Sequence, residues 1–317
     1  MQYRTLGNSD LKLSVLGIGC NNFGPRADIE TTRRVIHHAI DIGVNHFDTA
    51  DFYGGDGKSE DFMGQVIGDK RKQMILATKF GLPMTAGSGG SRNYVKTAIE
   101  ASLKRLRTDY IDLYYLHKPD PKTPIEETLG ALDELKKQGK IRWYANSNME
   151  GSEIDAADAA AKKNKLAPFV AAQDELSLIK RGTERERIPA MLRHGLTFIP
   201  YFPLASGLLT GKYKRNQPMP AGTRLATAGR LADVFMNDTN MELTYKLGEF
   251  CDKRGLNMLD VAFAWLLAKP YITSVIAGAV KTDQIDANAK ATDFKLSAAD
   301  VTELDKLTVD AVKSQPH

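Results

Sequence analysis

The feature that most constrains the fold is a regular alternation between short apolar runs and longer amphipathic segments, which continues along most of the chain. Short runs rich in β-branched and aromatic residues are typical of buried strands, and longer runs with helical periodicity are typical of helices. Eight runs are predicted to be strands, at residues 15–19, 44–48, 74–79, 111–116, 141–146, 169–173, 196–201 and 272–276. The stretch 3–14 before them is predicted to form a hairpin.

The segments between the predicted strands are long enough to let neighbouring strands run parallel. Residues 28–42, 94–106 and 124–138 have amphipathic helical patterns, and a helical crossover is what a parallel pair of strands requires. Regular eightfold alternation predicts an α/β fold, a closed (β/α)8 TIM barrel with an N-terminal β-hairpin and extended loops at its C-terminal face.

The glycine motifs of nucleotide-binding folds are incomplete in this chain. An open doubly wound sheet, the alternative to the barrel, normally carries G-x-G-x-x-G in its first turn. Here that turn reads GIGCNNFG, with Asn22 in place of the third glycine, which favours the barrel. A P-loop is also excluded, because Phe52 stands where GDGKSE would need a glycine, and Tyr213 follows Lys212 where Ser or Thr is required.

Composition narrows the class of protein. The 317 residues include no linker rich in Ser, Pro or Gly, so we expect one domain over residues 1–317. The 43 basic and 39 acidic residues give a net charge of +4, too mild for nucleic acid but suited to a small anionic cofactor. The chain has no signal-peptide pattern and no apolar run near the roughly 20 residues of a membrane helix, so we expect a cytoplasmic location. Two cysteines, Cys20 and Cys251, and six histidines lack ligand spacing, so no metal site is expected.

Polar residues stand at or just after the ends of three successive predicted strands. Asp48 ends one strand and Tyr53 follows five residues later, Lys79 ends the next strand, and His117 follows the third. Taken singly, each has an ordinary explanation as a turn, surface or loop residue. The four together favour an active site, because active sites of barrels lie where the carboxyl ends of the strands meet.

The chemistry of these four residues is coherent. A tyrosine with a pKa of about 10 is a poor acid at neutral pH, and lowering its pKa by about two units takes roughly 2.7 kcal/mol. A neighbouring ammonium group supplies this stabilisation, and a carboxylate holds the ammonium in place. We therefore expect Tyr53 to donate a proton, with its pKa lowered by Lys79 and Asp48, and His117 to align a polarised oxygen.

Seven motifs follow one another along nearly the whole length of the chain: FDTADFYG (47–54), GKSEDFMG (57–64), ATKF (77–80), SLKRLRTDYIDLYYLH (102–117), KIRWYANSN (140–148), YFPLASGLLTGKY (201–213) and IAGAVKTDQIDAN (276–288). Through these motifs the chain resembles the aldo-keto reductase family. The resemblance implies the same barrel and hydride transfer between NADP(H) and an aldehyde or ketone, without metal or flavin. It makes Tyr53 the general acid/base, with Lys79 and Asp48 tuning it and His117 orienting the carbonyl.

The resemblance further implies a cofactor site at the later strand ends. Ser147, Asn148 and Gln173 match residues that hold the carboxamide, and Tyr201 matches the aromatic that stacks on the nicotinamide. The remaining positions lie after the last two strands, where barrels commonly bind phosphate: Pro203, Leu204, Gly207, Lys212, Gly278, Lys281, Gln284 and Asn288. Lys281 opens a helix whose free N–H groups favour an anion; it is expected either to meet a 2′-phosphate or to be an ordinary solvated lysine.

The substrate and its pocket are less constrained. A small-molecule carbonyl substrate is expected in a pocket lined by Asn21, Asn22, Phe23, Arg26, Phe52 and Phe80. Arg26 fits either recognition of a carboxylate or phosphate or a plain surface arginine. The stretches 81–91 and 203–238 are candidate mobile covers. Two other hypotheses stay open: an NADPH-sensing regulatory subunit with slow turnover, and a structural barrel without chemistry. No oligomeric state is predicted.

Overall fold

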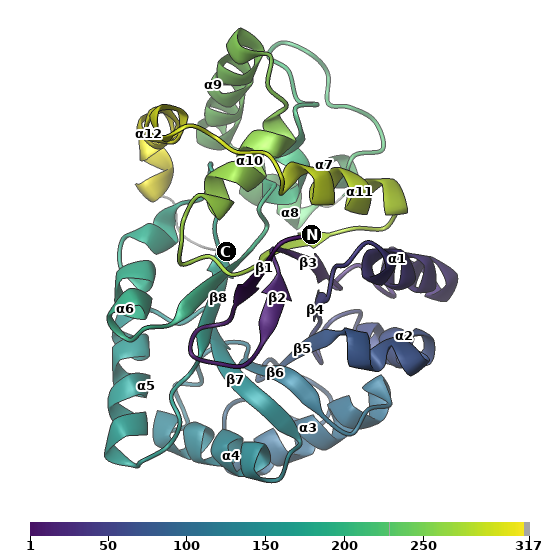
Figure 1. Ribbon diagram of the computed structural model, residues 1–317, viewed down its shortest axis with the longest axis vertical. Coiled ribbons are helices and arrows are strands. Elements are labelled where there is room, and N and C mark those ends of the chain that lie inside the picture. Colours follow the sequence, from purple (N-terminus) through teal and green to yellow (C-terminus); the bar gives the residue numbers. More distant parts are fainter. Residues whose placement is uncertain (228, 314–317) are drawn as a thin grey trace.

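The computed structural model describes residues 1–227 and 229–313, and its centre is a closed barrel of parallel strands (Figure 1). The strands run around the barrel in the order β10-β3-β4-β5-β6-β7-β8-β9. Their bounds are β3 Leu16–Gly19, β4 His46–Asp48, β5 Ile75–Phe80, β6 Ile111–Leu116, β7 Ile141–Ser147, β8 Ala171–Glu175, β9 Thr197–Tyr201 and β10 Val275–Gly278. The predicted (β/α)8 barrel is confirmed.

The predicted strand bounds are wrong by several residues at the last strand. β10 begins at Val275, three residues after the predicted start. Ile272 is fully buried but makes only an isolated bridge with Phe198. An apolar run reveals which residues are buried, and it does not reveal where the backbone begins to pair with both neighbours.

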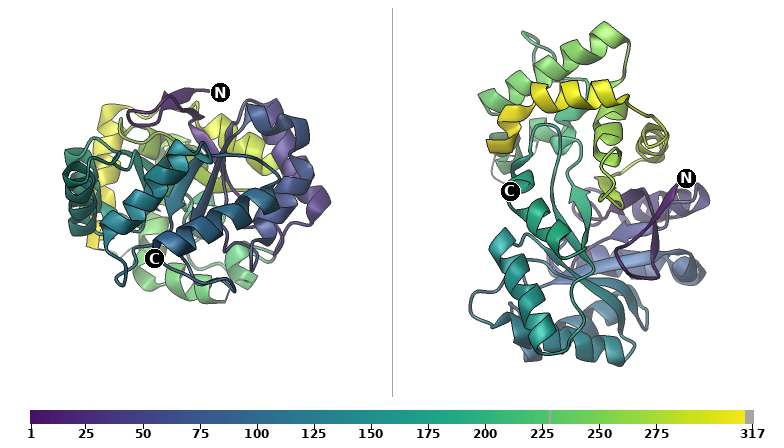
Figure 2. Two further views of the ribbon diagram at one scale, coloured as in Figure 1. Left: turned by 90° about the horizontal axis from the view of Figure 1, so that it is seen from below. Right: turned by 60° about the vertical axis from the view of Figure 1, so that its left-hand side comes forward.

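Helices surround the barrel, as the two views of Figure 2 show. Those that cross between successive strands are α1 Ile29–Asp41, α2 Lys58–Val66, α3 Arg92–Leu106, α4 Ile125–Lys137, α5 Gly151–Lys163 and α6 Arg187–Arg193. The rest follow β9: α7 Arg224–Thr227, α8 Arg230–Phe235, α9 Asp238–Arg254, α10 Met258–Leu267, α11 Thr282–Ala291 and α12 Ala298–Leu307. The three helices named from the sequence are present within two residues of their predicted ends. Within the described ranges, no helix combines the length and apolar character that crossing a membrane requires.

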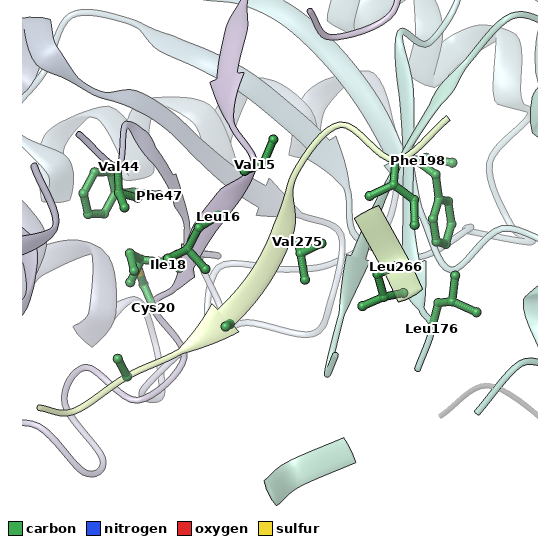
Figure 3. Packing of buried hydrophobic residues seen from close by; sticks show 14 of the residues in the cluster. Val15, Leu16, Ile18, Cys20, Val44, Phe47, Leu176, Phe198, Leu266 and Val275 are labelled. Carbon is green, nitrogen blue, oxygen red and sulfur yellow. The ribbon is translucent and has the colours of Figure 1, made fainter. Parts of the chain in front are cut away.

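Apolar side chains form two layers, one on each side of the barrel wall. Outside it, residues such as Leu16, Phe47 and Val275 pack in a layer shared with the helices (Figure 3). Inside it, Ile75 and Ala77 of β5 join a second layer with Leu6, Leu11 and Leu13 from the hairpin of β1 Tyr3–Thr5 and β2 Lys12–Ser14. Because side chains alternate along a strand, Lys79 continues the inward row of Ile75 and Ala77.

Candidate active site

A cavity of about 1040 Å³ lies at the carboxyl ends of the barrel strands. Residues at or next to the ends of six strands line it, namely Gly19, Asp48, His117, Ser147, Tyr201 and Gly278, together with Gln173, which lies within β8. The cavity therefore occupies the face of the barrel at which the sequence predicts an active site.

The four predicted catalytic residues meet at this cavity. Lys79 Nζ lies 2.6 Å from Asp48 Oδ2 and 3.2 Å from the Tyr53 hydroxyl. The rings of Tyr53 and His117 pack edge to face, with their centroids 5.8 Å apart. Asp48, Tyr53 and His117 line the cavity, whereas Lys79 is fully buried behind them.

The backbone after β4 brings Tyr53 over the lysine. The amides of Thr49 and Asp51 donate to the carbonyls of Ala77 and Lys79, at 2.9 and 3.1 Å, and so extend the contact between β4 and β5 beyond Asp48. The Tyr53 carbonyl then accepts from the amide of Ser59 in α2, at 3.0 Å. The loop that carries Tyr53 is thus fixed at both ends.

Hydrogen bonds fully occupy the buried ammonium group. Besides Asp48 and Tyr53, Lys79 Nζ donates to the Thr49 carbonyl at 2.8 Å, so its three N–H donors have three acceptors. The other carboxylate oxygen of Asp48 accepts from Gln173 Nε2 at 2.9 Å. This bond ties the catalytic residues to β8, and the sequence did not predict it.

The prediction that the pKa of Tyr53 is lowered is wrong for this structure. Burial raises the pKa of Tyr53 above its ordinary value, and the Lys79 ammonium offsets that effect only in part. The prediction considered the ammonium but not the cost of moving a phenolate out of water. The raised pKa keeps the phenol protonated at neutral pH, which is the state that a proton donor needs.

Lys79 and His117 differ in charge at neutral pH, since Lys79 is positive and His117 is neutral. Burial lowers the pKa of Lys79, but Asp48 and Tyr53 raise it by more, so the group stays an ammonium. Burial, and then the charge of Lys79, lower the pKa of His117 well below its ordinary value. The imidazole is therefore neutral, with Nδ1 lacking a hydrogen-bond partner among the described residues.

All the predicted cofactor-binding residues line the cavity. They are Ser147, Asn148, Gln173, Tyr201, Pro203, Leu204, Gly207, Lys212, Gly278, Lys281, Gln284 and Asn288. Asn148 has a left-handed backbone with φ of 56°, which asparagine tolerates better than most residues. Its Nδ2 donates to the His117 carbonyl at 2.9 Å, and its Oδ1 accepts from the Tyr201 hydroxyl at 2.8 Å. Binding of a carboxamide by Asn148 must therefore share or replace the Tyr201 contact.

The segment after β9 provides polar groups that the sequence analysis missed. Ser206 and Gly207 have left-handed backbones, with φ of 56° and 107°. Ser206 Oγ and Thr223 Oγ1 are buried and have no hydrogen-bond partner among the described residues, and both residues line the cavity with Lys212. Buried hydroxyl groups normally have a partner, so these two hydroxyls and the Lys212 cation, which line the same cavity, could hold a phosphate. Residues 203–238 contain one serine and three threonines, so the composition of this segment gave no signal for these hydroxyls.

The predicted substrate pocket is only partly correct. Asn22 and Arg26 line the cavity, but Phe23, Phe52 and Phe80 are not among its lining residues. Phe80 follows the inward-facing Lys79 and so points outward, where it stacks on Tyr114 with ring centroids 4.8 Å apart. Phe23 is fully buried in the core, and Phe52 is 46% exposed.

The two predicted covers differ in this structure. Residues 81–91 are fixed by side chains from other elements: the Gly90 amide donates to Asp120 Oδ2 at 2.9 Å, and its carbonyl accepts from Thr128 Oγ1 at 2.8 Å. The segment 203–238 contributes Ser206, Lys212 and Thr223 to the cavity; its position 228 lies outside the described residues.

Comparison with known proteins agrees with the motifs. The model of the aldo/keto reductase family matches residues 15–309. The chain is 35% identical over 302 residues to a probable voltage-gated potassium channel subunit beta of Arabidopsis thaliana, with 92% of each chain covered. It is 31% identical over 325 residues to the L-glyceraldehyde 3-phosphate reductase of Escherichia coli (strain K12), with 98% of this chain and 93% of that protein covered. An uncharacterised oxidoreductase of Bacillus subtilis (strain 168) is 34% identical over 309 residues, with 93% and 92% covered.

Proposed function

The chain belongs to the aldo/keto reductase family, and from this premise we propose that it reduces aldehydes or ketones to alcohols with NADP(H), using Tyr53 as general acid/base. The observation that carries the proposal is the buried ammonium of Lys79, held between Asp48 and the Tyr53 hydroxyl at the wall of a large cavity. A buried lysine paired in this way is costly to maintain, and a role in stabilising a phenolate accounts for its position.

A reduced nicotinamide, when bound, supplies a hydride to the carbonyl carbon. Tyr53 donates its proton to the carbonyl oxygen as negative charge develops there. The phenolate that results lies 3.2 Å from Lys79 Nζ, and a charge-assisted hydrogen bond is roughly twice as strong as a neutral one. His117 is neutral at neutral pH and orients the carbonyl oxygen by a hydrogen bond. In the reverse direction Tyr53 takes the proton back.

The chain's own residues support a dinucleotide with an additional phosphate. Ser206, Thr223 and Lys212 offer a cation and two hydroxyls without a partner among the described residues, on the β9 side of the cavity. Lys281 stands at the N-cap of α11, and a helix N-terminus favours an anion, although the first-turn amide of Gln284 already donates to Asp283 Oδ1 at 2.9 Å. Asn288 is buried on the same helix and lines the cavity. These groups favour NADP(H) as the cofactor.

A second candidate function comes from the relatives. Probable or putative voltage-gated potassium channel beta subunits from Arabidopsis thaliana, rice and fission yeast are 34–35% identical to this chain. An NADPH-sensing regulatory subunit would use the same cavity but would turn over slowly and release the cofactor slowly. The rate of turnover therefore separates the two functions.

The test is NADPH oxidation by the wild type and by Tyr53→Phe with aromatic, short aliphatic and acidic aldehydes. We expect the variant to lose about 10²- to 10⁴-fold in kcat, which is the range for loss of a general acid. The Kd for NADPH should stay within about twofold, because the substitution removes only a hydroxyl that points toward the substrate. Tight NADPH binding by the wild type without turnover of any aldehyde would instead favour the sensor.

A further inference from the structure

The order of strands divides the cavity into two halves. Asp48 ends β4 and Tyr53 follows it, Lys79 is in β5 and His117 follows β6, whereas the expected cofactor residues lie in or after β7, β8, β9 and β10. These two sets of strands are contiguous around the barrel, with β3 next to β4. On the proposed function, the substrate therefore lies in the half of the cavity between β3 and β6.

The charged side chains of this half are mostly basic. Arg26, after β3, and Lys118, after β6, line it together with Asp48. Asp48 is neutralised by its ion pair with Lys79. Neither Arg26 nor Lys118 has an ion pair with any residue in the described ranges. The half thus has an uncompensated positive charge, carried by two exposed side chains, which favours the approach of anions.

The cation at Arg187 in the same cavity provides a contrast. Arg187 forms ion pairs with Asp174 and with Glu150. Its charge is thus neutralised within the protein. Lys212 and Lys281, in the cofactor half, resemble Arg26 and Lys118 in having no ion pair among the described residues, so unpaired cations line both halves of the cavity.

Arg26 is carried by a well-ordered turn. The amides of Arg26 and Ala27 both donate to the Asn22 carbonyl, at 3.0 and 2.9 Å, and the Gly24 amide donates to the Ala27 carbonyl at 2.9 Å. Phe23 and Ala27 are buried and anchor the two sides of the turn. A side chain on a fixed backbone loses less conformational entropy when it binds a ligand.

The charge of Arg26 also acts inside the cavity. Burial, and then the charge of Arg26, lower the pKa of Arg224, which lines the cavity from the segment after β9. The two like charges repel each other, and an anion that approaches Arg26 reduces that repulsion.

We propose that the substrate of this chain is an aldehyde or ketone that carries an anionic group, a carboxylate or a phosphate, and that Arg26 binds this group. The planar guanidinium matches both anions with two parallel hydrogen bonds. Lys118 adds positive potential from the other side of the catalytic residues. Arg26 is thus a specificity-determining residue, and the proposal rests on the proposed reductase function.

The test compares matched pairs of aldehydes: 4-carboxybenzaldehyde with 4-carbamoylbenzaldehyde, and glyceraldehyde 3-phosphate with glyceraldehyde. We expect the wild type to prefer at least one anionic member by tenfold or more in kcat/KM, and the pair with the larger ratio identifies the anion. Arg26→Gln is expected to reduce that ratio by about tenfold or more, mainly through KM, since one charge-assisted bidentate contact is lost. Arg34→Gln is the matched control, because Arg34 is exposed on α1 outside the cavity lining and its loss should leave the ratio unchanged.

The outcomes separate this inference from the proposed function. Turnover of the neutral aldehydes without preference for either anion, or a preference that survives in Arg26→Gln, overturns the inference alone. If Arg26→Gln binds NADPH more weakly and loses kcat/KM equally for both aldehydes of each pair, Arg26 contacts the cofactor and not the substrate. That result also overturns the inference. Failure of the wild type to reduce any of the four aldehydes contradicts the proposed function, and the inference falls with it.

Discussion

At the scale of single residues, the site depends on Lys79, whose ammonium is fully buried and bonded to Asp48, Tyr53 and the Thr49 carbonyl. Its position follows from side-chain alternation, because Ile75 and Ala77 precede it on the inward face of β5. The sequence therefore predicts this residue well. It does not predict the bond between Asp48 and Gln173, because nothing in the local pattern around residue 48 indicates which strand end lies opposite.

Removing Lys79 should lower both stability and activity, but only the stability should be restored when Asp48 is also replaced. Lys79→Met leaves Asp48 buried without its counter-ion, so the free energy of unfolding should fall by about 3–5 kcal/mol. The double variant Asp48→Asn/Lys79→Met should recover most of that loss but no activity, because the phenolate still lacks an ammonium. Urea unfolding and kcat are the measurements; recovery of kcat in the double variant would contradict the assigned role of Lys79.

Asp51 should make stability depend on pH. Burial, and then the nearby Glu60, raise the pKa of Asp51 to about 7, against opposing effects of Arg105 and Lys79. In the unfolded chain the pKa is about 3.9, so the folded state binds the proton more tightly and loses stability as the pH rises through this window. Asp51→Asn should raise the free energy of unfolding by up to about 4 kcal/mol at pH 8 and by much less at pH 4.5.

Urea unfolding of the wild type and Asp51→Asn at the two pH values is the check. If the free energy of unfolding rose by the same amount at pH 8 and at pH 4.5, the carboxyl of Asp51 would not titrate between these pH values in the folded protein. The folded structure would then not favour the protonated carboxyl.

At the scale of elements, the support of the Tyr53 loop by α2 depends on one close approach between helices. A Cβ on Gly64 in α2 would overlap the Arg105 carbonyl oxygen and lie 2.8 Å from the Leu106 carbonyl carbon, both on α3. Backbone atoms cannot move aside as a flexible side chain can. The sequence contains this glycine within GKSEDFMG, but the reason for it is a contact between elements, which a local pattern does not reveal.

Two glycine substitutions should therefore have opposite effects. Gly64→Ala forces α2 and α3 apart and should cost about 1–3 kcal/mol or more. Gly248→Ala in α9 is the matched control, since its Cβ would lie 3.6 Å from Met258 Cε, an ordinary contact, and should gain about 0.5–1 kcal/mol from helix propensity. Thermal unfolding of both variants measures this, and an equal change in the two would exclude the close approach as the cause.

At the scale of the whole molecule, the barrel and its catalytic residues are predictable from the sequence because both follow from period and spacing. The part of the cavity that we propose binds phosphate is less predictable from the sequence. Ser206 and Thr223 are brought to the cavity by a chain path with left-handed residues such as Ser206 itself, and no periodicity describes such a path. The prediction that Phe80 lines the substrate pocket is wrong for a different reason. Side-chain alternation from the inward-facing Lys79 already indicates that Phe80 lies on the outer face of the barrel.

Cofactor binding should act on one predicted cover and not on the other. NADPH should increase hydrogen-exchange protection around Ala205–Thr210, where Ser206 lines the cavity with an unpartnered hydroxyl. The loop 81–91 should change little, because Asp120 and Thr128 already hold it. Hydrogen exchange with and without NADPH tests this, and increased protection confined to 81–91 would reverse the assignment.

On the proposed function, reduction of a carbonyl in this cavity takes a hydride from the nicotinamide and a proton from Tyr53. A single-turnover experiment measures both: enzyme in excess of NADPH that carries deuterium at both C4 positions is mixed with an aldehyde that the wild type accepts, and deuterium at the former carbonyl carbon is followed by mass spectrometry. We expect one deuterium transferred per NADPH in the wild type, even if product or cofactor release is slow, and a rate lower by about 10²- to 10⁴-fold in Tyr53→Phe. Deuterium transfer at equal rates in both proteins would exclude Tyr53 as the proton donor.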